Sequence, residues 1–257
     1  MSEGPTISYL ICGSQRSGTT LLATALASTG VAGRPEEYFL SVDEKKMPEW
    51  RCWERGPFGV AHGATSREDY LRIVSRLGTT PNGVFGSKLH WNNVPWAVAK
   101  FQELPRFAGL SRAGVLHRAF PGLQAVHLTR RDRVAQAVSW ARAARDGVWT
   151  DWVDRPSPVR PPPPQYDATF IANLEGLIAE GERGWRELFV ELGVEPLDLE
   201  YEELVTDDRL DVAVRRVLDH LGINHAQIGP VRPGTRRLAD GVNEEWAARY
   251  RSETAAP

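Results

Sequence analysis

The sequence has little net charge and no long apolar run. Its 31 Lys and Arg residues nearly balance 33 Asp and Glu residues, which leaves a formal net charge of −2 over 257 residues. Without a basic excess there is no broad field to attract nucleic acid, so any anion site must be built locally from a few arginines. No segment approaches the roughly 18 apolar residues that a membrane-spanning helix needs. We therefore expect no nucleic-acid partner, no membrane span and a small-molecule ligand.

Cysteine is also scarce, with only Cys12 and Cys52 in the chain. No spacing of His and Cys residues is typical of a metal site, so we expect no metal. The first residues, MSEGPT, contain no apolar secretory region, which indicates a cytoplasmic protein with reduced thiols. The hydrophobic content of 42% suffices for one substantial core, and we expect a single domain over residues 1–257.

The most informative segment is residues 7–22, ISYLICGSQRSGTTLL. Its uncharged apolar start predicts a buried strand of a parallel sheet, and the apolar residues after Thr20 predict a helix. Gly13 and Gly18 permit a tight turn between the two. The free N–H groups at the start of a helix attract anions, so we expect phosphate or sulfate here. A strand, turn and helix without any ligand is the alternative.

The glycine spacing is close to the loop G-x-x-x-x-G-K-[ST] of nucleoside triphosphate-binding proteins, but the lysine is missing. Thr19 occupies the lysine position, and the cation is Arg16, three residues earlier. A P-loop kinase also needs an acidic residue at a strand end to hold magnesium, and Asp132 comes too late, behind two arginines. A kinase is therefore the less favoured alternative.

A second strand, Leu123–Thr129, ends at Arg130 and leads into an amphipathic segment that contains Ser139. An arginine at a strand end and a serine about two helical turns later can hold one phosphate together. Apolar strands alternating with helical segments predict an α/β fold with a central, mainly parallel sheet flanked by helices.

Two carboxylates, Glu36 and Glu37, lie between a proline and two aromatic residues. The chain that leaves the first helix of such a sheet returns beside the ligand loop, so one carboxylate is expected to face inward as a general base. Two solvated glutamates are the alternative.

These ordered motifs resemble those of sulfotransferases that use 3′-phosphoadenosine 5′-phosphosulfate (PAPS). Their phosphosulfate loop usually reads P-K-S-G-T-T, and this chain has QRSGTT at residues 15–20. Nearly the whole chain is similar to the trehalose 2-sulfotransferase family of actinobacteria, through the segment from Arg130 to Ser139 and through SQRSGTTLL, TGVAGRPEEYF, TPNGVFGSKLHWN and NEEWAARYR. The resemblance implies a P-loop-like sulfotransferase fold and a possible homodimer.

The resemblance also implies roles for individual residues. PAPS would donate the sulfuryl group, with its 3′ phosphate on Arg130 and Ser139. Arg236 or Arg237 would complete that pocket, with a solvated basic tail as the alternative. The phosphosulfate would lie on Gln15, Arg16, Ser17, Gly18, Thr19 and Thr20.

In the same family the general base is a glutamate at the position of Glu37. Arg16 would stabilise the charge on the departing phosphate. We expect the pKa of Glu37 to be near its ordinary value or modestly raised, as suits a base at neutral pH.

The acceptor implied by the resemblance is a small molecule with a hydroxyl group, either a trehalose-like sugar or a secondary metabolite. Candidate acceptor residues lie at the carboxyl end of the strand predicted within residues 83–93 or in an aromatic loop; they are Lys88, His90, Trp91, Asn92, Trp50 and Trp53. His90 could equally be a half-buried structural histidine. The alternative to an enzyme is a protein that binds PAPS or its desulfated product without catalysis.

The proline-rich segment at residues 155–164 is expected to be an extended internal loop.

Overall fold

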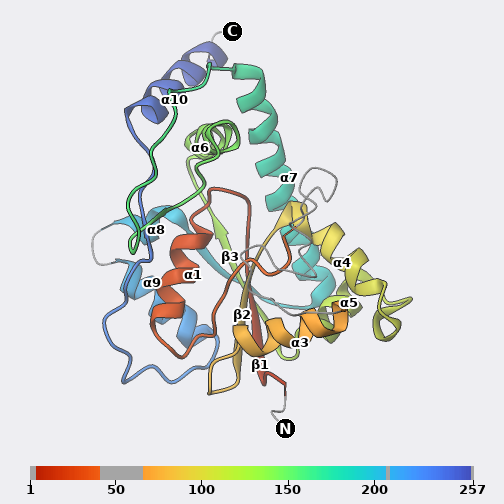
Figure 1. The fold of residues 1–257 in the computed structure, drawn as a ribbon. Helices are drawn as coiled ribbons and strands as arrows, with labels where there is room; N and C mark the ends of the chain where they lie inside the picture. Colours follow the sequence, from red (N-terminus) through yellow and green to blue (C-terminus); the bar gives the residue numbers. More distant parts are fainter. Residues whose placement is uncertain (1–3, 41–65, 207–208, 256–257) are drawn as a thin grey trace.

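A parallel sheet forms the centre of the protein (Figure 1). The computed structural model describes residues 4–40, 66–206 and 209–255. In this part of the chain the strand order is β2-β1-β3-β5, and each neighbouring pair is parallel. The strands are β1 (Ile7–Gly13), β2 (Val84–His90), β3 (Leu123–Thr129) and β5 (Leu197–Glu200). Because all four run the same way, their carboxyl ends meet at one edge, as predicted for an α/β fold.

Strand β1 is buried on both faces, which explains its uncharged sequence. Leu10 and Cys12 point into one apolar cluster, while Tyr9 and Ile11 point into another on the opposite face. The first cluster lies under the helices α3 (Arg67–Gly78), α4 (Val94–Gln102), α5 (Arg112–Ala119) and the second half of α7 (Ala168–Leu192). The second lies under α1 (Thr19–Ser28), α8 (Tyr201–Val205) and α9 (Arg209–His220).

A third apolar cluster lies beyond the carboxyl edge of the sheet (Figure 1). It joins the first half of α7 to α6 (Arg133–Asp146) and α10 (Gly241–Thr254). The remaining short elements are η2 (Trp91–Asn93), η3 (Pro105–Phe107) and the antiparallel pair β4 (Asp151–Trp152) and β6 (Thr235–Arg236). Residues 155–164 contain no helix or strand, as expected of the proline-rich segment.

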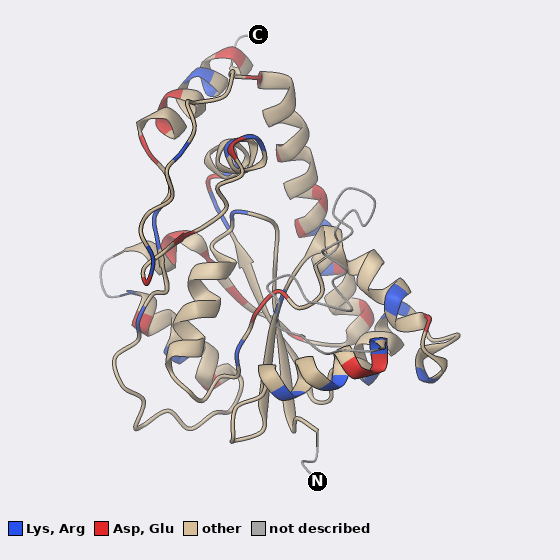
Figure 2. Cartoon of the chain, in the orientation of Figure 1, with Lys and Arg blue, Asp and Glu red and all other residues tan. Residues whose placement is uncertain are grey.

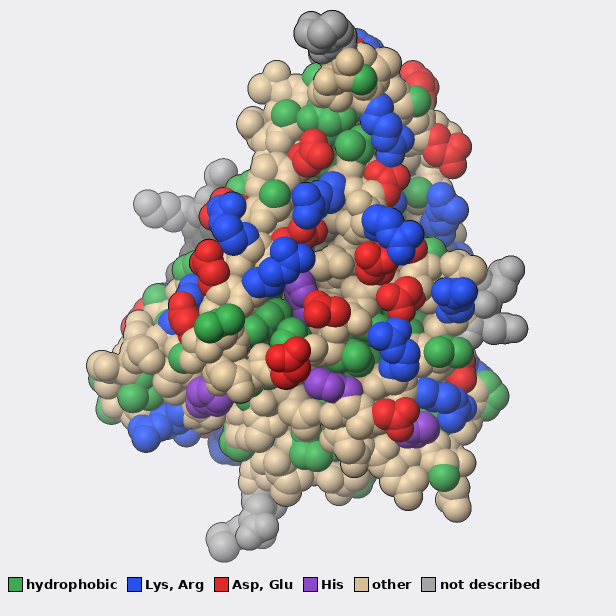
Figure 3. All heavy atoms as spheres, turned by 180° about the vertical axis from the view of Figure 1, so that it is seen from behind, with side chains coloured by type: hydrophobic (Ala, Val, Ile, Leu, Met, Phe, Trp, Pro, Cys, Tyr) green, Lys and Arg blue, Asp and Glu red, His purple; other side chains and the backbone are tan. Residues whose placement is uncertain are grey.

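Charged residues lie mainly on the helices and connecting loops, and few lie on the strands (Figure 2). On the face opposite to that of Figure 1, basic and acidic side chains are interspersed (Figure 3). No helix among the described residues is long and apolar enough to span a bilayer.

Candidate active site

The loop between β1 and α1 leaves the start of α1 open. Gly18 begins the helix with a φ of 92°, and no described side chain caps that end. A Cβ atom on Gly18 would lie 2.6 Å from the Tyr201 ring, so both the backbone angle and the available space require glycine. Arg16 also has a positive φ, 66°, which turns the loop back on itself. The open N–H groups and the helix dipole make this end of α1 suitable for an anion.

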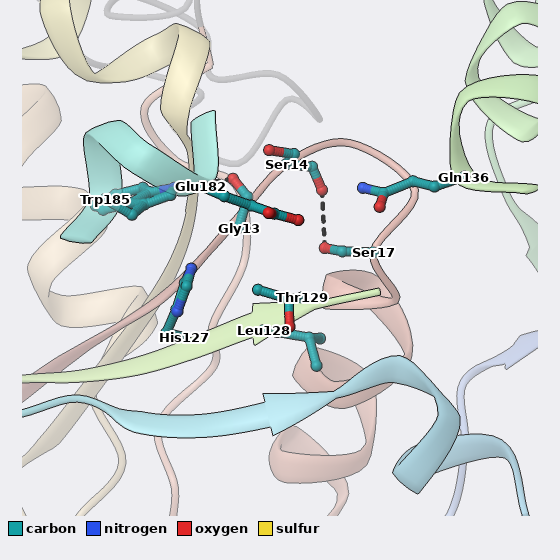
Figure 4. Close-up of a pocket in the computed structure, with 9 residues that line it drawn as sticks. All are labelled: Gly13, Ser14, Ser17, His127, Leu128, Thr129, Gln136, Glu182 and Trp185. Atoms are coloured by element: carbon teal, nitrogen blue, oxygen red, sulfur yellow. Dashed lines mark hydrogen bonds between the residues drawn. The ribbon is translucent and has the colours of Figure 1, made fainter. Parts of the chain in front are cut away.

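Side chains of α6 and α7 lie on two sides of the loop, Gln136 on one and Trp185 on the other (Figure 4). The Gln136 side-chain amide donates a hydrogen bond of 2.8 Å to the Gln15 carbonyl, and the Trp185 indole donates one of 3.0 Å to the Gly13 carbonyl. Within the loop, the Ser17 hydroxyl donates to the Ser14 carbonyl at 2.8 Å. These bonds fix the loop backbone before any ligand arrives.

Arginines gather beside this loop. Nε of Arg16 donates to the Ser139 hydroxyl at 3.0 Å, which joins the loop to α6. The Arg130 guanidinium lies over the Tyr201 ring, 4.6 Å from its centroid, and its buried Nε has no hydrogen-bond acceptor among the described residues. Burial, together with the charges of Arg130 and Arg160, lowers the pKa of Arg16 to about 10. Several cations thus converge here, which favours a bound anion.

The sequence did not decide whether Arg236 or Arg237 belongs to this group of cations. The charge of Arg237 acts on Arg130. Burial lowers the pKa of Arg130, and the charge of Arg237 lowers it further. Arg236 instead donates to Asp151 at 2.8 Å and to the Trp152 carbonyl at 2.7 Å, which joins β6 to β4. Its guanidinium is therefore used to hold these two loops together.

Sequence reasoning missed Arg160, which lies within the proline-rich segment. Its guanidinium is 3.2 Å from an Asp240 oxygen and 3.9 Å from an Asp146 oxygen, and its charge acts on Arg16. An arginine in a segment without regular structure has no periodicity or motif to reveal its position.

The inward-facing carboxylate is Glu37, whereas Glu36 is half-buried. The backbone of Glu36 pairs with β2, because its carbonyl accepts a 3.0 Å hydrogen bond from the Lys88 N–H. This pairing directs the Glu37 side chain to the end of β2. There it lies 3.2 Å from Nζ of Lys88 and 2.9 Å from Nδ1 of His90, and Asn93 donates to it at 3.3 Å.

The expected pKa of Glu37 is wrong. Burial alone would raise it, but Lys88 and His90 both favour the ionised carboxylate by charge and by hydrogen bonding, and they bring the pKa well below its usual range. The sequence offered no sign of these contacts, since Glu37 and Lys88 are far apart in the chain. In this state the carboxylate is ionised but is a weak base.

Lys88 and His90 connect Glu37 to residues 15–20, which we call the anion loop. Nζ of Lys88 donates to the Thr20 hydroxyl at 2.8 Å, and Nε2 of His90 lies 3.0 Å from the Thr19 hydroxyl. The carboxylate and the start of α1 are therefore parts of one site.

The other acceptor candidates differ in position. Asn92 is exposed and accepts a 2.6 Å hydrogen bond from Gln15, so it lies at the edge of the anion loop. The Trp91 indole is half-buried and packs against the Trp185 ring of α7, with centroids 5.5 Å apart. Trp50 and Trp53 lie outside the described residues.

No three His, Cys, Asp or Glu side chains in the described part of the chain are grouped as metal ligands.

Comparisons with known proteins identify the family of this chain. A trehalose 2-sulfotransferase of Mycolicibacterium smegmatis is 38% identical over 98% of this chain and 97% of its own length. One of Mycobacterium tuberculosis is 34% identical over 95% and 94%. The sulfotransferase domain from the curacin biosynthetic pathway shares the fold, with a TM-score of 0.51 at 12% identity over 100% of this chain and 99% of that one. The family model described as Stf0 sulphotransferase matches residues 8–253, and the chain belongs to this sulfotransferase family.

Proposed function

We propose that this protein transfers the sulfuryl group of PAPS to a hydroxyl of a sugar, with Glu37 as the general base. The observation that carries the proposal is the connection of a buried carboxylate to the anion loop. Glu37 contacts Lys88 and His90, and these contact Thr20 and Thr19 at the start of α1. A base within reach of a bound anion is what sulfuryl transfer to a hydroxyl requires.

Two separate groups of donors suit the two anionic ends of PAPS. The open start of α1 suits the 5′ phosphosulfate, because its N–H groups have no side-chain cap. Arg130 and Ser139 suit the 3′ phosphate, and the unpaired buried Nε of Arg130 supports this assignment. We propose Arg237 rather than Arg236 as the additional cation, since Arg236 is bonded to Asp151 and Trp152.

In the proposed reaction Glu37 accepts the proton of the acceptor hydroxyl as the hydroxyl oxygen attacks sulfur in line. A new sulfur–oxygen bond forms while the bond between sulfur and the 5′-phosphate oxygen breaks. The electron pair of that bond stays on the phosphate, which leaves as adenosine 3′,5′-bisphosphate (PAP). Arg16 and the N–H groups of α1 stabilise this charge, so most of the rate enhancement comes from positioning and electrostatics.

Trehalose is the first acceptor to test, because two relatives with full-length similarity are named for it. His90 and Asn92 are the described polar residues that we expect to contact the sugar, and Trp53 is a further expectation outside the described residues. A hydroxyl of a secondary metabolite is the alternative acceptor. The homodimer and the cytoplasmic location remain predictions.

The test is mass spectrometry of trehalose, other sugars and host metabolites after incubation with PAPS and the protein. We expect one acceptor to gain one sulfuryl group while PAPS becomes PAP. In parallel, calorimetry should show binding of PAP. Binding of ATP with magnesium, together with no binding of PAP, would refute the proposal.

A further inference from the structure

Lys88 lies between the Glu37 carboxylate and the Thr20 hydroxyl, at the loop where the donor anion is proposed to bind. Its Nζ is 3.2 Å from Glu37 and donates to the Thr20 hydroxyl at 2.8 Å. The side chains of Lys88 and Glu37 are only 8% and 10% exposed, so solvent screens this pair weakly. Among the residues that the structure describes, Glu37 is the carboxylate with which Lys88 forms an ion pair.

Donor binding changes this balance. A phosphosulfate on the loop would place negative charge beside Thr20, within reach of the same ammonium group. A lysine side chain is a flexible point charge with three donors, and it can turn toward a new anion without movement of the backbone. Glu37 would keep its contacts with His90 and Asn93 but lose its ion pair with Lys88.

We propose that Lys88 shifts from Glu37 to the donor anion on the anion loop, so that donor binding itself turns Glu37 into an effective base. This inference rests on the proposed function and adds an order of events to it. Before the donor binds, the Lys88 pair keeps Glu37 ionised and weakly basic. Afterwards the same lysine stabilises the sulfuryl and phosphate oxygens, and Glu37 can accept the acceptor proton.

The neighbours of Glu37 indicate that Lys88 is the group that changes partner. Glu37 is faced by Lys88 and His90 from β2, by Asn93 from η2 and by Glu36 from its own segment. Asn93 is neutral, and Glu36 is bound through its backbone to β2. His90 uses Nδ1 for Glu37 and has Nε2 at Thr19, so its ring can orient the carboxylate while the donor is bound.

The experiment follows the Glu37 carboxyl carbon by ¹³C NMR in protein labelled at glutamate, with the signal assigned by its loss in Glu37→Gln. The pH is lowered from 7 to 4 with and without saturating PAP, whose 5′ phosphate supplies the anion. The same titration is done on Lys88→Met and on the control Lys100→Met, which removes a lysine paired with Glu103 on α4. Thermal melting checks that each variant is folded.

In the unchanged protein and in Lys100→Met, we expect no midpoint for Glu37 above pH 4 without PAP, and a midpoint that rises into the range above pH 4 when PAP binds. Lys88→Met should show a midpoint above pH 4 already without PAP, and this midpoint should rise much less with PAP. The bound phosphates also repel the carboxylate directly and titrate near pH 6, but both effects are common to all variants. The difference between the PAP-induced rises therefore isolates Lys88.

An equal rise in Lys88→Met and the unchanged protein would overturn the inference, and so would the absence of a rise in the unchanged protein. Lys88→Arg provides a second variant, which keeps the charge and should keep a PAP-induced rise. Failure of the proposed function is seen separately. It would be shown by full sulfuryl transfer in Glu37→Gln or by the absence of PAP binding.

Discussion

Replacement of Arg130 by Met tests the assignment of the 3′ phosphate. The guanidinium lies over the Tyr201 ring, and its buried Nε has no acceptor among the described residues. Methionine keeps an unbranched apolar stem but is shorter than arginine, and it removes the charge, the donors and the guanidinium that lies over Tyr201. Arg131→Met is the matched control, because the next side chain is 70% exposed and pairs with Glu200.

The expected loss follows from the number of hydrogen bonds. A hydrogen bond to a charged group contributes about 1.5–3 kcal/mol, and about 1.4 kcal/mol is a tenfold change in affinity. Arg130→Met should therefore weaken PAP binding by about 10- to 100-fold. It should leave the binding of adenosine 5′-monophosphate, which lacks the 3′ phosphate, nearly unchanged.

Isothermal titration calorimetry with both nucleotides measures this difference. Arg131→Met should bind PAP like the unchanged protein. If Arg131→Met loses as much PAP affinity as Arg130→Met, the assignment to Arg130 is wrong. If Arg130→Met loses affinity for both nucleotides equally, its role is not recognition of the 3′ phosphate.

Three further predictions concern the carboxylate and the loop. Glu37→Gln should lower the rate of sulfuryl transfer by about 10²- to 10⁴-fold and keep PAP affinity, measured by mass spectrometry and calorimetry; an unimpaired rate would exclude Glu37 as the base. The same variant should also change the acid dependence of stability. The pKa of Glu37 is lower in the folded protein than its ordinary value of about 4.3. Ionised Glu37 therefore stabilises the folded state above about pH 4.3, and this stabilisation is lost as the pH falls toward the pKa of the folded protein. Urea unfolding should thus show the largest deficit of Glu37→Gln near neutrality and a shrinking one below about pH 4; a deficit that does not depend on pH would contradict the pairing with Lys88. Gly18→Ala should destabilise the fold by about 1–3 kcal/mol, since alanine is strained at this φ and meets the Tyr201 ring. Gly176→Ala, at an open position of α7, should instead be neutral or stabilising in the same thermal melts.

The parts of the structure around the site that the sequence predicted are local ones. The strand, turn and helix of residues 7–28 follow from glycines and hydroxyl residues between two apolar segments. The strand Leu123–Thr129 has the predicted bounds because its seven residues carry no charge and end at a pair of arginines. In both segments the evidence lies within one strand and the helix that follows it, where spacing alone determines which side chains share an edge.

The parts that the sequence did not predict depend on packing between distant segments. The low pKa of Glu37 comes from Lys88 and His90, which β2 brings beside it. The packing of the Trp91 ring against Trp185 of α7 also joins segments that are far apart in the chain. Arg160 reaches the arginine group only because the proline-rich segment is bonded to Asp240 at the start of α10. No local pattern encodes these distances.

The pairing of β4 with β6 has a consequence for evolution of the donor site. Arg236 bonds Asp151, Trp152 and Val153, so the connection between α6 and α7 is joined to the loop that also carries Arg237. Insertions or deletions in that connection would change the reach of Arg237, the cation proposed for the donor, without touching β2 or Glu37, the proposed base. We therefore predict that nucleotide affinity and acceptor chemistry can diverge independently in descendants of this chain.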